Sequence, residues 1–109
     1  MENSAVKKIK SAVLGRRYDL SVAFVSVPEM RHAMRYKKSR TTKISNVLSF
    51  PLSKTSGEIL ICKSAAKPYS VEFLFIHGLL HLKGLKHGAI MEHEEDRLLK
   101  RFGFSRTNG

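Results

Sequence analysis

Cysteine and long apolar runs are the features that this chain of 109 residues most clearly lacks. Its single cysteine, Cys62, excludes an intrachain disulfide and suits a reducing compartment. No apolar run is long enough to cross a bilayer, and the basic N-terminal segment lacks the apolar core of a signal peptide. The sequence therefore predicts a cytoplasmic protein that has no membrane partner and folds as one domain over residues 1–109.

Acidic residues are also scarce, with nine against 20 lysines and arginines, which gives a net charge of +11. The imbalance is greatest in residues 31–43, which contain no acid. The six bases of this basic segment are Arg31, Arg35, Lys37, Lys38, Arg40 and Lys43. Such a run is often only a solvated face, but an undiluted positive block favours a polyanion, because phosphate contacts release counterions. We therefore expect these six residues to bind RNA.

Hydrophobic periodicity predicts the order helix, strand, helix, strand, strand, helix, helix. The expected helices span residues 4–14, 28–38, 68–84 and 92–102, and the expected strands span residues 20–27, 47–52 and 58–62. This order predicts an α/β (α+β) fold, in which helices pack on a small mixed sheet. A right-handed parallel crossover should join the first two strands, and an antiparallel hairpin should join the second and third. The tail after Phe104 is expected to fray.

The third expected helix is apolar on almost every side, which predicts that it is buried at the centre of the fold. It carries His77 and His81, whose four-residue spacing puts both rings on one face, about 6 Å apart at their β-carbons. Gly84 can end the helix with a positive φ and turn the chain, so that His87 approaches the same point. A lone histidine in such a helix is usually a core residue, but three convergent imidazoles favour a metal centre.

Three histidine ligands leave one position open, which is typical of catalytic zinc rather than of a closed structural site. We expect one Zn²⁺ per chain, with Ni²⁺ as the alternative in the same site. Zinc peptidases with the pattern H-E-x-x-H carry a glutamate base directly after the first histidine, where this chain has Gly78. The missing base disfavours proteolysis. A fourth imidazole, His93, is expected to be exposed, and Cys62 is expected to pack in the core.

Residues 77–87, H-G-L-L-H-L-K-G-L-K-H, resemble the zinc motif of the YbeY family, whose pattern is close to H-G-x-L-H-L-x-G-y-D-H. Residues 45–51, S-N-V-L-S-F-P, are similar to a second family signature, T-(D/N)-V-L-S-F-P. Residues 57–62 are similar to the strand that follows it. The resemblance covers roughly residues 22–102 and departs from the pattern at Lys86, where the family has aspartate.

The resemblance implies a metal-dependent endoribonuclease that prefers single strands and acts in ribosomal RNA maturation and ribosome quality control. Ribosomal RNA and the ribosomal subunit would then be its partners. An arginine shortly before the second signature is a catalytic candidate in the family, which points to Arg40 first and to Arg35 second. If the family's aspartate supports a metal ligand, Lys86 cannot replace it, so we expect either weaker metal binding or substitution by Glu92 or Glu94.

An alternative interpretation comes from a different class of protein. The chain would then be a non-catalytic or weakly active accessory protein that contains zinc and binds RNA or the ribosome. Lys86 and the shifted position of Arg40 favour this alternative. A zinc peptidase is a distant third interpretation, because of Gly78.

Overall fold

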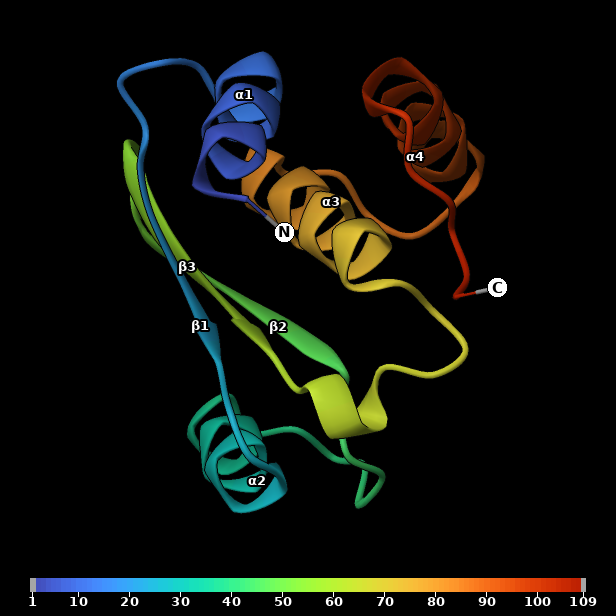
Figure 1. Cartoon of the computed structure of the whole chain (residues 1–109). Coiled ribbons are helices and arrows are strands. Elements are labelled where there is room, and N and C mark those ends of the chain that lie inside the picture. Colours follow the sequence, from blue (N-terminus) through green and yellow to red (C-terminus); the bar gives the residue numbers. More distant parts are fainter. Residues whose placement is uncertain (1, 109) are drawn as a thin grey trace.

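The computed structural model describes residues 2–108, in which helices pack on a small mixed sheet, and it confirms the predicted α+β fold (Figure 1). No helix in this part of the chain is both long and apolar enough to span a membrane. In chain order, the elements are α1 (Asn3–Leu14), β1 (Asp19–Phe24), α2 (Val27–Tyr36), β2 (Val47–Ser53), β3 (Ser56–Ile61), the short 3-10 helix η1 (Lys63–Ala65), α3 (Val71–Lys83) and α4 (Ala89–Phe102).

The sheet has the strand order β1-β3-β2. β3 pairs in parallel with β1, where Asp19 lies opposite Ser56, and antiparallel with β2 across the expected hairpin. The prediction of a parallel crossover between the first two strands was therefore wrong, because β3 lies between them and β2 runs opposite to β1. β3 is the strand most suited to the centre, since its residues alternate between buried and half-buried positions along its whole length.

The two faces of the sheet are covered by different helices. Ile59 and Ile61 of β3 belong to the main core, which also contains residues of α1, α3 and α4. Leu60, which points the other way, joins a smaller core with Met30 and Met34 of α2. Cys62 is fully buried in this smaller core, as predicted. The helix α3 thus lies within the larger layer, against the sheet.

The entry into α2 explains why β1 is shorter than expected. Ser26 begins the helix with a capping box, in which the Ser26 hydroxyl accepts from the Glu29 backbone N–H at 3.3 Å. The Glu29 carboxylate in turn accepts from the Ser26 backbone N–H at 2.9 Å. Because these bonds satisfy the free donors of the first turn, the helix begins at Val27 and the strand ends at Phe24.

The central helix α3 is buried on most sides, as its composition predicted. Its buried residues are Phe73, Leu74, Phe75, Ile76, Gly78, Leu79 and Leu80. It begins at Val71 rather than at Pro68, because the Ser70 hydroxyl caps it by accepting from the Phe73 backbone N–H at 3.0 Å. It ends as expected at Gly84, whose φ of 106° lies in the left-handed region.

Gly78 brings α3 very close to the sheet. A β-carbon at this position would lie 3.0 Å from Ile59 Cδ1 and 3.1 Å from Ser49 Oγ. The Ser49 hydroxyl also donates a hydrogen bond to the Gly78 carbonyl oxygen at 2.9 Å, from a buried position on β2. This hydrogen bond holds the turn of α3 that carries His77 against β2.

The C-terminal segment, residues 104–108, is hydrogen-bonded to the residues that precede α3, so the prediction that it frays was wrong. The Ser70 backbone N–H donates to the Arg106 carbonyl at 2.9 Å, and the Ser70 hydroxyl donates to the Ser105 carbonyl at 2.6 Å. The Asn108 backbone N–H donates to the Pro68 carbonyl at 3.1 Å. These partners lie 35 to 40 residues away in the sequence, where local patterns cannot reveal them.

Candidate metal centre

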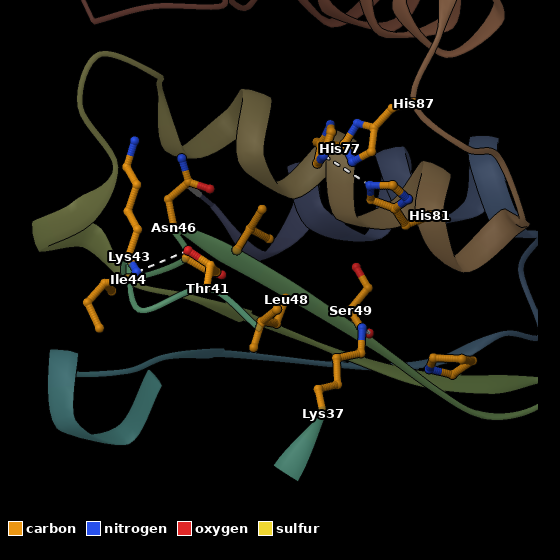
Figure 2. A pocket seen from close by; sticks show the side chains of 13 residues that line it. Lys37, Thr41, Lys43, Ile44, Asn46, Leu48, Ser49, His77, His81 and His87 are labelled. Atoms are coloured by element: carbon orange, nitrogen blue, oxygen red, sulfur yellow. Dashed lines mark hydrogen bonds between the residues drawn. The ribbon is translucent and has the colours of Figure 1, made fainter. Parts of the chain in front are cut away.

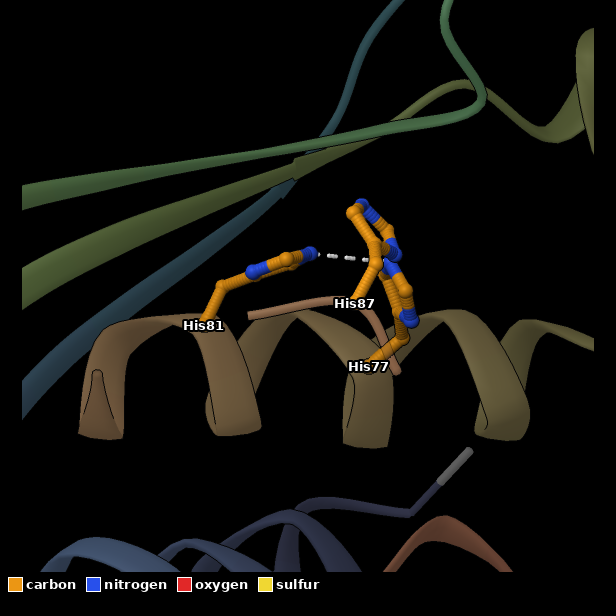
Figure 3. A group of neighbouring side chains, drawn as sticks. All are labelled: His77, His81 and His87. Carbon is orange, nitrogen blue, oxygen red and sulfur yellow. Dashed lines mark hydrogen bonds between the residues drawn. The ribbon is translucent and has the colours of Figure 1, made fainter. Parts of the chain in front are cut away.

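Three imidazoles converge at one point beside α3. His77, His81 and His87 each offer a ring nitrogen, and these three atoms lie within 4.8 Å of one another (Figure 3). His77 and His81 project from successive turns of α3, and His87 reaches them from the loop that follows Gly84. The predicted convergence of the three rings is therefore present in the structure.

The second ring nitrogens of the two helical histidines have partners that fix their tautomers. His77 Nδ1 lies 2.6 Å from Glu95 Oε2, and His81 Nδ1 lies 3.2 Å from the Leu85 carbonyl oxygen. Because a carboxylate and a carbonyl accept, each Nδ1 carries the proton and donates it. The Nε2 atom of each ring is then left with a free lone pair.

These free lone pairs fit a metal ion. His77 Nε2 and His81 Nε2 lie 3.0 Å apart, and two unprotonated nitrogens cannot hydrogen-bond each other. A cation coordinated by both nitrogens would remove the repulsion between their lone pairs, and His87 supplies a third donor nearby. The donor set suits zinc or another divalent transition ion that prefers imidazole.

The environment of His81 favours its neutral form. Burial lowers the pKa of His81, and the proximity of His77 and His87 lowers it further. The hydrogen bond to the Leu85 carbonyl acts in the opposite direction. Neutral imidazole is the form that binds metals, so this ring is prepared for coordination at neutral pH.

The histidines face a cavity of about 630 Å³ between α3 and β2 (Figure 2). Its lining residues are Lys37, Thr41, Lys43, Ile44, Ser45, Asn46, Val47, Leu48, Ser49, Pro51, His77, His81 and His87. They come from the basic segment, from the second signature and from the histidine cluster. The cavity can therefore present a metal, hydrogen-bonding groups and positive charge to one ligand.

Comparison with known sequences identifies the family of this chain. The sequence profile of the family described as "Endoribonuclease YbeY" matches residues 2–103. This chain belongs to the YbeY family. A protein of Rubrobacter xylanophilus named "Endoribonuclease YbeY" is 39% identical over 84 residues, which cover 73% of this chain and 61% of that protein. The match thus spans less than two thirds of that relative's length.

Two further relatives carry the same name. The one from Sulfurimonas denitrificans is 31% identical over 94% of this chain and 84% of its own length. The one from Legionella pneumophila (strain Corby) is 29% identical over 80% of this chain and 70% of its own length. No solved structure matches the chain.

Only part of the basic segment reaches the cavity beside the histidines. All six bases are exposed, but only Lys37 and Lys43 line the cavity, and the other four lie outside its lining: Arg31, Arg35, Lys38 and Arg40. The Lys37 ammonium donates to the Ser49 carbonyl oxygen and lies 5.0 Å from the centre of the Phe50 ring. Burial lowers the pKa of Lys37.

The carboxylate that supports a histidine is Glu95, not Glu92 or Glu94 as expected from the sequence. The Glu94 carboxylate instead binds Arg97 at 2.7 Å. Lys86, which replaces the aspartate of the YbeY pattern, is exposed, and so is His93, as predicted. Glu95 could have been found from its position, because it is the one acid on the buried stripe of α4 that also contains Met91, Leu98 and Leu99.

Metal content gives a direct test of this centre. The protein, purified without chelators and dialysed with zinc or nickel, is expected to hold one ion per chain, since three imidazole nitrogens converge. Elemental analysis against protein concentration measures the ratio. Finding no transition metal, either as purified or after zinc addition, would contradict the assignment of His77, His81 and His87.

Proposed function

We propose that this chain is a metal-dependent endoribonuclease that cleaves single-stranded RNA, and that its substrate in the cytoplasm is ribosomal RNA of the ribosomal subunit. The observation that carries the proposal is the shared cavity, which histidine rings and the Lys37 amine line together. Such a site combines the two requirements of phosphodiester hydrolysis, a nucleophile and a positive charge for the transition state. The name shared by the relatives, "Endoribonuclease YbeY", agrees with this reaction.

His77, His81 and His87 would hold the ion, Zn²⁺ or alternatively Ni²⁺. When bound, this ion would activate water and polarise a phosphoryl oxygen. The chain's own contribution is to hold two Nε2 lone pairs ready, by binding the Nδ1 protons to Glu95 and to the Leu85 carbonyl. No carboxylate follows the first histidine, since Gly78 lies there against the sheet.

Lys37 is the cation that we assign to the scissile phosphate, because it lines the cavity together with the histidines. Its side chain is already held in place by the Ser49 carbonyl oxygen and the Phe50 ring. Positive charge fixed before the reaction is most effective where charge develops in the transition state. Arg40 and Arg35, the candidates implied by the family resemblance, remain the next choices and are tested alongside it.

The other members of the basic segment serve a different purpose in this proposal. Arg31, Arg35, Lys38 and Arg40 would contact phosphates of the nucleotides that flank the cavity, together with Lys43 at its rim. Such contacts position the strand without reading its sequence. They also make affinity depend strongly on salt, because each contact releases counterions.

The salt dependence of RNA binding tests this surface. The double variant Arg31→Ala/Lys38→Ala is expected to flatten the plot of log affinity against log salt by about one to two units. Lys7→Ala/Lys8→Ala, which removes two exposed lysines of α1, is the matched control and should leave the slope unchanged. Equal slopes for the wild type and Arg31→Ala/Lys38→Ala would place the RNA elsewhere.

Cleavage itself tests the function. Protein loaded with zinc is incubated with an end-labelled single-stranded RNA and, separately, with the same RNA in a duplex. We expect internal cuts in the single strand, little cleavage of the duplex, and loss of activity on adding a chelator. If the loaded protein binds the single strand but never cuts it, the chain is an RNA-binding accessory protein instead.

A further inference from the structure

A buried carboxylate lies directly behind the metal centre. Glu95 of α4 is only 3% exposed, and its Oε2 atom receives the His77 Nδ1 proton at 2.6 Å. Its other oxygen, Oε1, lies 3.6 Å from Arg106 Nη1. Both oxygens of this one carboxylate therefore face positively polarised groups, one on a metal ligand and one on the C-terminal segment.

Arg106 is itself held from several directions. Its Nη2 atom donates to Asp96 Oδ1 at 2.7 Å, and its guanidinium lies 4.5 Å from the centre of the Phe73 ring. Its carbonyl oxygen accepts from the Ser70 backbone N–H at 2.9 Å. The C-terminal segment thus carries an arginine whose place is fixed relative to the start of α3.

Packing alone does not explain Glu95. Its neighbours on the buried face of α4 are Met91, Leu98 and Leu99, so an apolar residue would fit the stripe. A buried carboxylate costs several kcal/mol of desolvation unless its partners compensate, and a buried ion pair is poor evidence for added stability. The contact that distinguishes Glu95 is the one to His77, a residue of the histidine cluster.

We propose that Arg106, Glu95 and His77 form a positioning relay, through which the C-terminal segment sets the metal affinity of the centre. The inference rests on the proposed function only in taking the histidine cluster as a metal site. The Glu95 carboxylate fixes the ring orientation and tautomer of His77 and makes its Nε2 a stronger donor. Arg106 holds the carboxylate in that place. Glu95 and Arg106 are positioning residues, since neither belongs to the ligand set.

The test measures zinc affinity by competition with a chromogenic chelator, in the full-length protein. Glu95→Gln keeps the size of the side chain but removes its charge, and we expect the affinity to fall by about 10- to 100-fold. Arg106→Ala should weaken zinc binding in the same direction by a smaller factor, and Arg106→Lys should recover part of the loss. The matched control is Arg97→Ala, which removes an arginine that also binds a carboxylate of α4.

A second readout separates positioning from general stability. Cobalt replaces zinc in imidazole sites, and its visible absorption reports the ligand geometry. The visible absorption spectrum of the cobalt-loaded protein should change in Glu95→Gln and stay unchanged in Arg97→Ala. Arg106→Ala, at a half-exposed position, keeps the test decisive if Glu95→Gln fails to fold.

The outcomes distinguish this inference from the proposed function. If zinc affinity is the same in the wild type and Glu95→Gln, or if Arg106→Ala behaves as Arg97→Ala does, the relay is wrong, even when the wild type cleaves RNA. If the affinities fall as expected but the loaded wild type never cuts RNA, the relay stands and the nuclease assignment fails. A wild type that binds no metal at all overturns both.

Discussion

Replacing His81 by alanine is expected to abolish RNA cleavage and to remove the bound metal, while RNA affinity changes by no more than about twofold, because the phosphate contacts lie elsewhere. His81 supplies one of the two Nε2 atoms that lie 3.0 Å apart, so its loss leaves two donors and no stable site. The basic segment lies outside α3 and keeps its charge. Elemental analysis, a cleavage assay and a binding titration on the same preparation measure the three quantities.

His93→Ala is the matched control for this substitution. His93 is an exposed histidine of α4, so its removal takes away an imidazole without touching the cluster. Its metal content and cleavage rate should equal those of the wild type. Metal-dependent cleavage by His81→Ala at the wild-type rate would show that the reaction takes place outside this cluster.

The variant Lys37→Ala is expected to keep its metal and to slow the chemical step by roughly 10² to 10³, the effect of losing one preorganised electrostatic group. Lys37 lines the cavity with the histidines, so its loss removes a positive charge near the reacting phosphate. The metal should stay, because the Nδ1 atoms of His77 and His81 are held by other groups. Single-turnover cleavage at saturating RNA measures this step separately from binding.

Arg40→Ala and Arg35→Ala provide the comparison for Lys37→Ala. Both arginines are exposed and lie outside the lining of the cavity, so their loss should affect binding more than the chemical step. If Arg40→Ala slows single-turnover cleavage and Lys37→Ala does not, the cation belongs to Arg40, as the family resemblance implies. If Arg35→Ala slows single-turnover cleavage instead, the cation is Arg35.

The histidine cluster was predictable because local rules determine most of it. A four-residue spacing puts His77 and His81 on one face of any helix, and Gly84 takes the left-handed conformation that ends α3. The two short strands of the hairpin and their antiparallel pairing followed from the turn between them. In each case, the residues that interact are close in the sequence.

The remaining features depend on contacts between distant parts of the chain. Glu95 lies 18 residues after His77, and nothing in the helical period of α4 indicates which ring it will meet. The parallel pairing of β1 with β3 depends on which strand of the hairpin is buried on both sides. The position of Lys37 depends on where the chain turns after Tyr36, where Lys38 adopts a φ of 57°.

Gly78 also limits what this scaffold can become. Glycine and glutamate codons can differ by one base, so a single mutation could place a peptidase-type base directly after His77. Even a methyl group there would press on Ile59 and Ser49 at 3.0–3.1 Å, and a longer side chain would force α3 away from the sheet. Packing therefore disfavours a substitution that a single base change could produce. Divergence toward peptide hydrolysis would first require the helix and the strand to separate.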